Sequence, residues 1–368
     1  MSQKAPIFEI FVAFSPRAKE FDRMEWDLVG LGNALLDVQV EAPDSFLTEI
    51  GAAKASMSLV TFKSQEETLQ KVRDRYGRFV KYTSGGSAAN TLAGFASFGG
   101  KGFFIGKVGA DENGRHYRED LENCGVKTAL SIGKHDYTGT CLALISPDAE
   151  RTMLTHLGVA VQLDPADILD EVILKTKCVY IEGYLWDSTS AREAARKAIQ
   201  TARSRGILVS MTTSDRFCVQ RHKSDFIELA QKHCDILFCN ETEAMELTDT
   251  TSPEAALQIL KVWTPTVCIT AGPRGVLLSH RKTNEVLSLE TWDVPLKDKL
   301  GAGDLFAAGF LYGHLKGHSL RESGFLGSYA ATRVIQQMGA RLEHPLKPHL
   351  PEALAGPLAN QKTLKIAL

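Results

Sequence analysis

A glycine-rich segment followed by an aspartate is the part of the sequence whose residue types most directly suggest chemistry. Residues 298–310 read DKLGAGDLFAAGF, with Gly301, Ala302 and Gly303 directly before Asp304. Apolar residues then recur at helical spacing, which predicts a helix that begins near Ala302. The first N–H groups of a helix have no partner within it and lie at the positive end of its dipole, so they stabilise anions. The segment therefore predicts a phosphate-binding helix N-terminus.

Asp304 has two interpretations at this position. A carboxylate beside a bound anion is repulsive unless it has a task, such as accepting the proton of a nucleophilic hydroxyl during phosphoryl transfer. An acidic residue in a first helical turn also offsets the helix dipole without any catalytic role. This segment alone leaves the two interpretations equally open.

The composition is ordinary for a globular protein and limits the classes of partner. The 368 residues are 44% apolar and 23% charged, enough for one large domain or two smaller ones. A net charge of -2 leaves no broad basic field, so we expect no polymeric nucleic acid as partner. Seven cysteines without a C-x-x-C pair argue against a disulfide framework. Because no apolar run reaches about 18 residues and no secretory signal is evident, we expect a cytoplasmic protein without membrane contact.

Strand and helix patterns alternate along most of the chain. Buried-strand patterns separated by helical ones occupy residues 27–32, 101–108, 178–181, 207–211, 235–238 and 266–270. This order predicts a doubly wound α/β core with a mainly parallel sheet flanked by helices. Short alternating segments and a hairpin near residue 147 interrupt it and predict a second, smaller sheet. The predicted division is a core of residues 1–33, 63–138 and 158–368 and a lid of residues 34–62 and 139–157, with residues 1 to about 24 either an added edge strand or disordered.

A second glycine-rich segment, SGGSAAN at residues 84–90, precedes another helical pattern. Gly85 and Gly86 permit close approach of the backbone, and Ser87 and Asn90, three residues apart, share one face of the first turn. The alternative is an ordinary glycine turn followed by a serine N-cap. A P-loop is excluded, because in the pattern that starts at Gly94 a second glycine, Gly100, stands where the motif requires Lys.

Polar residues also follow three of the predicted strands, at the edge where open α/β sheets bind ligands. Asn33 and Asp37 follow the first strand, whose G-x-G lacks the third glycine of a dinucleotide site and so disfavours a nicotinamide enzyme. Asn240 and Glu243 have the oxygen donors for a hydrated Mg2+, but their spacing is equally that of a capping box. The last group is Thr270, Gly272 and Gly275, which suit either a loop against a nucleotide or a plain turn.

In this order the motifs resemble those of the ribokinase-like (PfkB) small-molecule kinases, most closely the adenosine kinase branch. The likeness covers nearly the whole chain after residue 25. It rests on two long motifs, 84–111 and 301–309, and on shorter matches at 32–37, 138–141, 180–186 and 240–243. The resemblance implies the ribokinase-like fold, with a doubly wound, mainly parallel sheet flanked by helices and a small discontinuous β lid.

The resemblance also assigns roles to individual residues. Asp304 would be the general base, and the backbone of Gly301, Ala302 and Gly303 would form the anion hole. The residues implied to bind the substrate are Asn33, Asp37, Gly85, Gly86, Ser87, Asn90, Cys141, Leu142 and Tyr184. The residues implied to bind ATP are Asn240, Thr270, Gly272 and Gly275, with Asn240 and Glu243 organising Mg2+ through water. The lid would close over the substrate and exclude water.

The implied function is ATP-dependent phosphorylation of a primary hydroxyl. The substrate would be adenosine, which is converted to AMP in purine salvage. The enzyme would be a monomer or a homodimer. The alternatives are another PfkB kinase acting on ribose, fructose, inosine or guanosine, and a nucleoside-binding regulatory protein with little turnover. Lys299 and Leu300 stand where the family usually carries small polar residues. This departure does not determine whether the family's monovalent-cation site is present: either Lys299 would supply the positive charge instead, or the pair would indicate weakened catalysis.

Overall fold

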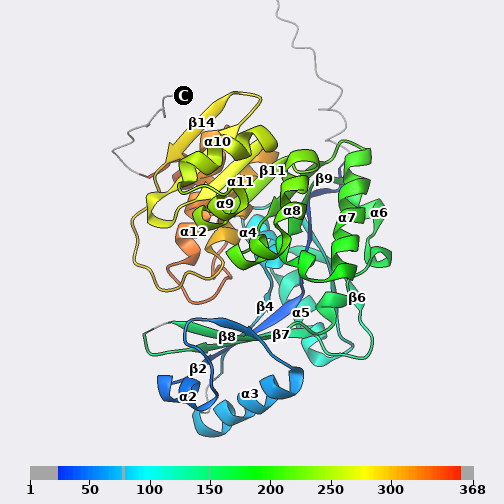
Figure 1. The fold of residues 1–368 in the computed structure, drawn as a ribbon, viewed down its shortest axis with the longest axis vertical. Coiled ribbons are helices and arrows are strands. Elements are labelled where there is room, and N and C mark those ends of the chain that lie inside the picture. The colour runs from blue at the N-terminus through cyan, green and yellow to red at the C-terminus, as the bar shows by residue number, and fades with distance from the viewer. Residues whose placement is uncertain (1–23, 77–78, 149, 358–368) are drawn as a thin grey trace, which may run out of the picture.

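The computed structural model describes residues 24–76, 79–148 and 150–357, so the N-terminal segment expected as an edge strand or as disorder lies outside it up to residue 23. A large sheet with helices on both faces forms the upper part of Figure 1, and a smaller sheet lies below it. The large sheet has the strand order β14-β13-β12-β11-β10-β9-β1-β5-β6. Its strands run parallel from β12 to β6, and β13 pairs antiparallel with both β12 and β14. The predicted doubly wound, mainly parallel core is confirmed.

The strands of the large sheet bury side chains on both faces. In β9, for example, Val179 and Ile181 join the core on one face, and Cys178 and Tyr180 join the core on the other. The strands are β1 (Trp26–Leu31), β5 (Gly102–Val108), β6 (Val126–Ile132), β9 (Thr176–Glu182), β10 (Leu208–Thr212), β11 (Ile236–Asn240), β12 (Thr266–Thr270), β13 (Val276–His280) and β14 (Glu285–Leu289).

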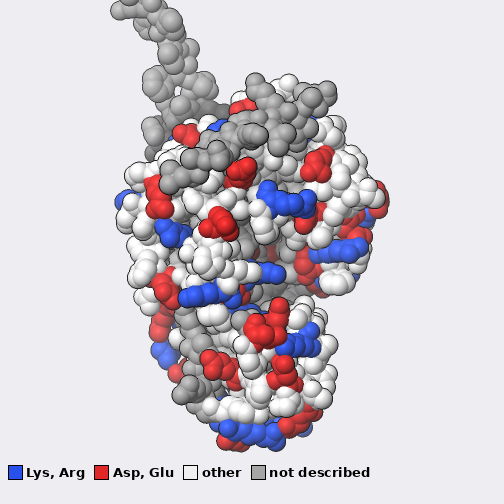
Figure 2. Space-filling model, turned by 90° about the vertical axis from the view of Figure 1, so that its left-hand side faces the viewer, with Lys and Arg blue, Asp and Glu red and all other residues white. Residues whose placement is uncertain are grey.

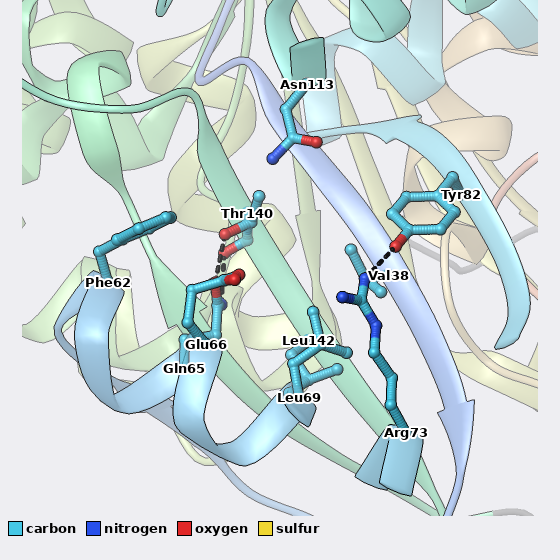
Figure 3. Close-up of a pocket in the computed structure, with 10 residues that line it drawn as sticks. All are labelled: Val38, Phe62, Gln65, Glu66, Leu69, Arg73, Tyr82, Asn113, Thr140 and Leu142. Atoms are coloured by element: carbon cyan, nitrogen blue, oxygen red, sulfur yellow. Dashed lines mark hydrogen bonds between the residues drawn. The ribbon is translucent and has the colours of Figure 1, made fainter. Parts of the chain in front are cut away.

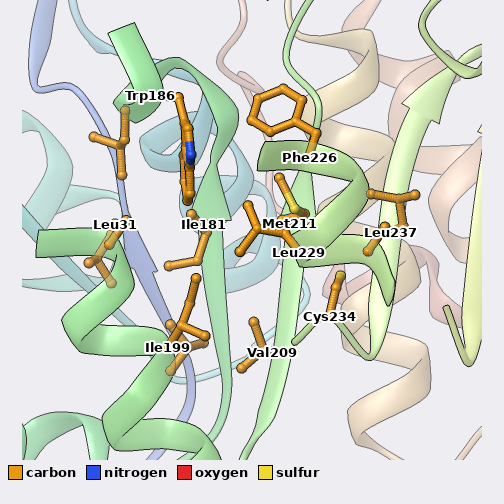
Figure 4. Packing of buried hydrophobic residues seen from close by; sticks show 14 of the residues in the cluster. Leu31, Ile181, Trp186, Ile199, Val209, Met211, Phe226, Leu229, Cys234 and Leu237 are labelled. Atoms are coloured by element: carbon orange, nitrogen blue, oxygen red, sulfur yellow. The ribbon is translucent and has the colours of Figure 1, made fainter. Parts of the chain in front are cut away.

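Two groups of helices cover the two faces of this sheet. One face packs against α7 (Thr189–Ser204), α8 (Arg216–Lys232), α9 (Glu241–Thr248) and α10 (Pro253–Trp263), and Figure 4 shows part of that core. The other face packs against α4 (Ser87–Ser97), α5 (Glu112–Asn123), α11 (Ala302–Leu315) and α12 (Leu320–Val334). The shorter helical elements are α6 (Asp170–Ile173), α13 (Leu350–Ala355), η1 (Gly158–Gln162), η2 (Pro165–Asp167), η3 (Gly183–Asp187), η4 (Gly272–Arg274) and η5 (Lys347–His349).

The second sheet has the order β3-β8-β7-β2-β4. Its strands are β2 (Leu35–Glu41), β3 (Met57–Leu59), β4 (Phe79–Gly85), β7 (Gly139–Ile145) and β8 (Arg151–His156). One face is covered by α2 (Asp44–Glu49) and α3 (Phe62–Tyr76), whose Phe46, Leu69 and Val72 join an apolar cluster with β2, β7 and β8. The predicted lid ranges leave out α3 and β4. These elements join the second sheet because its apolar face needs a cover and because β4 pairs along the free edge of β2.

Helices α4 and α11 approach closely at a glycine. A Cβ atom at Gly94 would lie 2.5 Å from a side-chain carbon of Leu305 and 2.9 Å from Ala308. Because α4 and α11 each begin directly after a glycine-rich segment, this contact brings the two segments together.

Two surface properties bear on the expected partners. On the face shown in Figure 2, basic and acidic side chains are interspersed over the described part of the molecule. Among the described helices, none has both the length and the apolar character required to cross a membrane.

Candidate active site

Asp304 is the point at which the two glycine-rich segments meet. The Ser87 hydroxyl donates a hydrogen bond to one carboxylate oxygen of Asp304 over 2.6 Å, and the Asn90 amide donates to the other over 2.8 Å. Helix α11 begins at Ala302, as predicted, after Gly301 in the left-handed conformation with φ 77°. Ser87 and Asn90 do share one face of α4, so the structure brings these predicted site residues together.

The first turn of α11 faces open space. A Cβ atom at Gly303 would meet no heavy atom within 4 Å, whereas one at Gly301 would lie 2.6 Å from Ala340. An anion can therefore approach the backbone at Gly303. Burial raises the pKa of Asp304, while the hydrogen bonds from Ser87 and Asn90 act in the opposite direction.

Gly85 and Gly86 make room for Asp37 and Asn33. A Cβ atom at Gly85 would lie 2.5 Å from the carboxylate of Asp37, and one at Gly86, where φ is 89°, would lie 2.2 Å from the carbonyl oxygen of Asn33. Only glycine fits at both positions. Burial raises the pKa of Asp37 to about 7, against the lowering influence of Arg341 and Arg151.

Glu182 holds two parts of the site, and the sequence interpretation missed it. It ends strand β9 and is only 1% exposed. One carboxylate oxygen accepts from the backbone N–H and the side-chain amide of Asn33, over 3.4 and 3.2 Å, and the other accepts from Ala88 N–H over 2.9 Å. Burial raises its pKa to about 7. The available signal was a lone carboxylate at the end of an otherwise apolar strand pattern.

A buried ion pair joins the second sheet to the segment before Gly301. Arg151 of β8 donates to the carboxylate of Asp298, and the two residues are 9% and 6% exposed. Asp298 also accepts from Gly339 N–H over 2.7 Å and from Leu300 N–H over 3.1 Å. Two guanidinium nitrogens of Arg151, Nε and Nη1, are buried without a hydrogen-bond partner among the described residues. Sequence alone gave no sign of this pair.

Lys299, the expected substitute for a bound monovalent cation, is exposed. In the described part of the chain no carboxylate forms an ion pair with it, and the side chain that pairs with Asp298, directly before Lys299, is Arg151.

Cys141 and Leu142, both predicted to touch the substrate, lie on opposite faces of the second sheet. Cys141 is paired in register with Asp37, and burial raises the pKa of its thiol to about 12. Leu142 belongs instead to the apolar cluster under α3, so its side chain points away from Asp37.

A cavity of about 180 Å³ lies on that other face, lined by Val38, Leu69 and Leu142 and rimmed by polar side chains (Figure 3). It is separate from the cluster around Asp304.

Tyr184 lies beside a different part of the molecule. It sits in η3, directly after Glu182, where its backbone N–H donates to the Ser214 hydroxyl over 3.2 Å. Burial and the nearby Asp215 raise the pKa of Tyr184 well above its ordinary value. Its hydrogen bonds in the structure therefore connect it to Ser214 and Asp215 and not to Asp304.

Asn240 and Glu243 form the capping box that was one of their two interpretations. The Asn240 side chain accepts from Glu243 N–H over 2.9 Å, and Glu243 accepts from Asn240 N–H over 3.0 Å and from the Thr213 hydroxyl over 2.6 Å. Burial raises the pKa of Glu243. Nowhere among the described residues do three or more His, Cys, Asp or Glu side chains cluster to hold a metal ion directly. The bonds of Asn240 and Glu243 are thus those of the capping box, with a further bond from Thr213.

Thr270, Gly272 and Gly275 lie next to Asn240. Thr270 is paired in register with Asn240 across β11 and β12. A Cβ atom at Gly275 would lie 1.9 Å from the Leu289 carbonyl oxygen, so this glycine serves the turn into β13, while one at Gly272 would meet nothing within 4 Å. Gly272 therefore leaves open space beside the ends of the two strands.

Comparison with known proteins gives two kinds of kinase. The 5-dehydro-2-deoxygluconokinase of Geobacillus thermodenitrificans is 29% identical over 301 residues, 77% of this chain and 89% of that protein. The adenosine kinase of Saccharomyces cerevisiae is 29% identical over 330 residues, 85% of this chain and 95% of that protein. The structure of adenosine kinase from Sinorhizobium meliloti matches with a TM-score of 0.81 and 36% identity, over 89% of this chain and 99% of that one.

A family model described as pfkB family carbohydrate kinase matches residues 53–346, which is well over half of the chain. The motifs at Asp304 and at Ser87 lie inside this match. The protein therefore belongs to the pfkB family of carbohydrate kinases, as an ATP-dependent kinase that transfers a phosphoryl group to an alcohol.

Proposed function

We propose that this kinase phosphorylates the 5'-hydroxyl of adenosine, with Asp304 as the general base. The observation that carries the proposal is the position of Asp304, fixed by Ser87 and Asn90 at the open N-terminus of α11. A carboxylate bound by two donors keeps one orientation, and Gly303 leaves space for an anion beside it.

In this mechanism Asp304 accepts the proton of the substrate hydroxyl as its oxygen attacks the γ-phosphoryl group. The N–H groups of the first turn of α11 stabilise the negative charge on the transferring group. Mg2+, bound through water near Asn240 and Glu243, would neutralise the phosphate oxygens of ATP. Thr270 and Gly272 lie beside Asn240 and would border the nucleotide.

A neutral polyol suits the charges around Asp304 better than an acid does. Asp304 raises the pKa of the carboxyl groups of Asp37 and Glu182, so an anionic substrate would add a further like charge. The 2',3'-diol of a nucleoside can donate to Asp37, and Asn90 Oδ1 is buried without a partner among the described residues. The adenosine kinases among the relatives are consistent with this choice.

One observation favours a second candidate, 5-dehydro-2-deoxygluconate. This sugar acid carries a carboxylate, and the unpartnered Nε and Nη1 of Arg151 are donors that a carboxylate could accept from. The relatives include kinases for this substrate.

We also propose that the second sheet is the substrate lid. It carries Asp37 on β2 and Arg151 on β8, and Arg151 contacts Asp298, which lies in the segment before Gly301. With the sheet closed over the substrate, Asp37 and Arg151 would face it and water would be excluded.

ADP release from Mg-ATP separates the candidates when measured with adenosine, D-ribose, D-fructose and 5-dehydro-2-deoxygluconate. We expect kcat/KM for adenosine to exceed kcat/KM for the sugar acid by at least about 10²-fold. Discrimination of this size arises when the wrong substrate leaves one or more buried polar groups of the site without a hydrogen-bond partner. A preference for the sugar acid would establish the second candidate. Tight adenosine binding without ADP release would indicate a regulatory protein.

A further inference from the structure

Arg341 is a buried guanidinium that joins three segments of the candidate site. It lies in the loop after α12 and is 6% exposed. Its Nη1 donates to the carbonyl oxygen of Ala89, in the first turn of α4, over 2.8 Å. Its Nη2 donates to the carbonyl oxygen of Ser84 and, over 3.1 Å, to the Ser84 hydroxyl. One side chain thus connects the C-terminal loop, the end of β4 beside Gly85, and the helix that carries Ser87 and Asn90.

All the hydrogen-bond acceptors of Arg341 are uncharged. In the described ranges no carboxylate lies within ion-pairing distance of it, and its Nε is buried without a partner. A buried guanidinium keeps its charge at any pH relevant here, and burying that charge is unfavourable unless negative charge lies near. Arg341 therefore carries a fixed positive charge that no partner within bonding distance neutralises.

The carboxylates on which the charge of Arg341 acts belong to the candidate site. Arg341 lowers the pKa of Asp304 and of Asp37, in both cases against burial, which is the larger influence and raises them. Asp304 also interacts with several groups on other elements. These are Ser87 and Asn90 on α4, Asp37 on β2, Tyr180 and Glu182 on β9, and Glu243 on α9. Asp37 is faced in addition by Arg151 and Cys141.

We propose that Arg341 is a positioning residue of the phosphoryl-transfer site. It holds residues 84–86 against α4 through its hydrogen bonds. Its fixed positive charge also stabilises the ionised form of the proposed base, Asp304. The proposal rests on the proposed function for the role of Asp304 as base, but the hydrogen bonds and the charge are properties of the folded chain without substrate.

The direction of the effect follows from the protonation state that the base needs. Asp304 accepts a proton only when it is ionised, so turnover falls as the pH drops through its pKa. Loss of the positive charge at residue 341 makes Asp304 hold its proton to a higher pH, and the acid limb of the pH profile moves upward. For unit charges several ångströms apart near a protein surface, the expected movement is about one pH unit, which is tenfold in the ionised fraction.

The test compares Arg341→Gln with Arg341→Lys. Glutamine is neutral but can still donate to Ser84, whereas lysine keeps the charge with a different set of donors. Arg333→Gln is the matched control, because Arg333 lies on α12 with Tyr329 and Glu352 as partners, outside the site. For each protein, kcat/KM for adenosine is measured by ADP release from pH 5 to 9.

We expect Arg341→Gln to move the acid limb upward by about one unit with its alkaline plateau retained, and Arg341→Lys and Arg333→Gln to leave the limb in place. Equal losses at every pH in both Arg341 variants would overturn the electrostatic role and leave only the hydrogen bonds.

A second readout does not depend on turnover. The carboxyl carbon of Asp304, labelled with 13C and assigned with Asp304→Asn, is titrated by NMR in the absence of substrate. A higher midpoint in Arg341→Gln than in Arg341→Lys supports the proposal, and identical midpoints overturn it. If the unmodified protein releases no ADP with adenosine or with any sugar, the proposed function fails, while the titration still tests the charge at Arg341.

Discussion

Gly303→Ala is expected to change stability and activity in opposite directions. Gly303 lies in the first turn of α11, is exposed, and has no atom within 4 Å of the position that a Cβ atom would take. Alanine at a compatible helical position stabilises a protein by about 0.4–1 kcal/mol, chiefly because it restricts the unfolded chain. The folded protein should therefore unfold at a slightly higher urea concentration.

Activity should fall in the same variant, because the methyl group occupies space that we assign to the transferring phosphoryl group. A displacement of about 1 Å in a reacting group can cost about 10²-fold in rate. We expect kcat/KM for ATP to fall by about that factor, while the dissociation constant of adenosine, measured by calorimetry, stays nearly unchanged.

Gly309→Ala is the matched control on the same helix. A Cβ atom there would lie 2.2 Å from the carbonyl oxygen of Leu326, so the backbones of α11 and α12 would have to separate. Overpacking of this kind typically destabilises by about 1–3 kcal/mol. The two variants share the same gain in helix propensity, so their difference reports the surroundings alone. A Gly303→Ala protein with unchanged turnover would refute the placement of the anion at this turn.

Three further predictions concern the residues around the base. Asp37→Ala should remove most of the preference for adenosine over 2'-deoxyadenosine, which a ratio of kcat/KM values measures; equal values for the two substrates in the unmodified enzyme would remove Asp37 from the ribose site. Arg151→Met should lower the free energy of unfolding by about 3–5 kcal/mol because Asp298 stays buried without its partner, and urea titration should show a smaller loss in the double variant with Asp298→Asn. Turnover should be insensitive to replacement of K+ by a bulky organic cation, because Arg151 already provides the positive charge at Asp298; strong activation by K+ would contradict this.

The parts of the site predicted from sequence are those set by local patterns. The start of α11 followed from two glycines before a helical repeat, and the common face of Ser87 and Asn90 followed from their spacing of three residues. Their joint contact with Asp304 joins residues more than 200 positions apart, and only the resemblance to a known family connected them beforehand.

The residues that sequence missed act through distant partners. Glu182, Arg151 and Arg341 contact segments 94 to 257 positions away, and no spacing rule relates such residues. Cys141 and Leu142 were both predicted to bind the substrate, but adjacent residues of a strand point to opposite faces, and Leu142 lies on the face that α3 covers. The second sheet is also larger than predicted, because β4 joins it by pairing with β2, a contact between strands that are distant in sequence.

The role of Asp304 is tested most directly by the turnover of Asp304→Asn. Asparagine remains acceptable near a helix N-terminus and can still bond Ser87, so the unfolding midpoint should stay close to that of the unmodified protein. Single-turnover measurement of ADP formation with adenosine and Mg-ATP should show a fall of about 10²–10⁴-fold, with the dissociation constant of adenosine little changed. Near-normal turnover in the folded variant would contradict the assignment and leave Asp304 only the task of offsetting the dipole of α11.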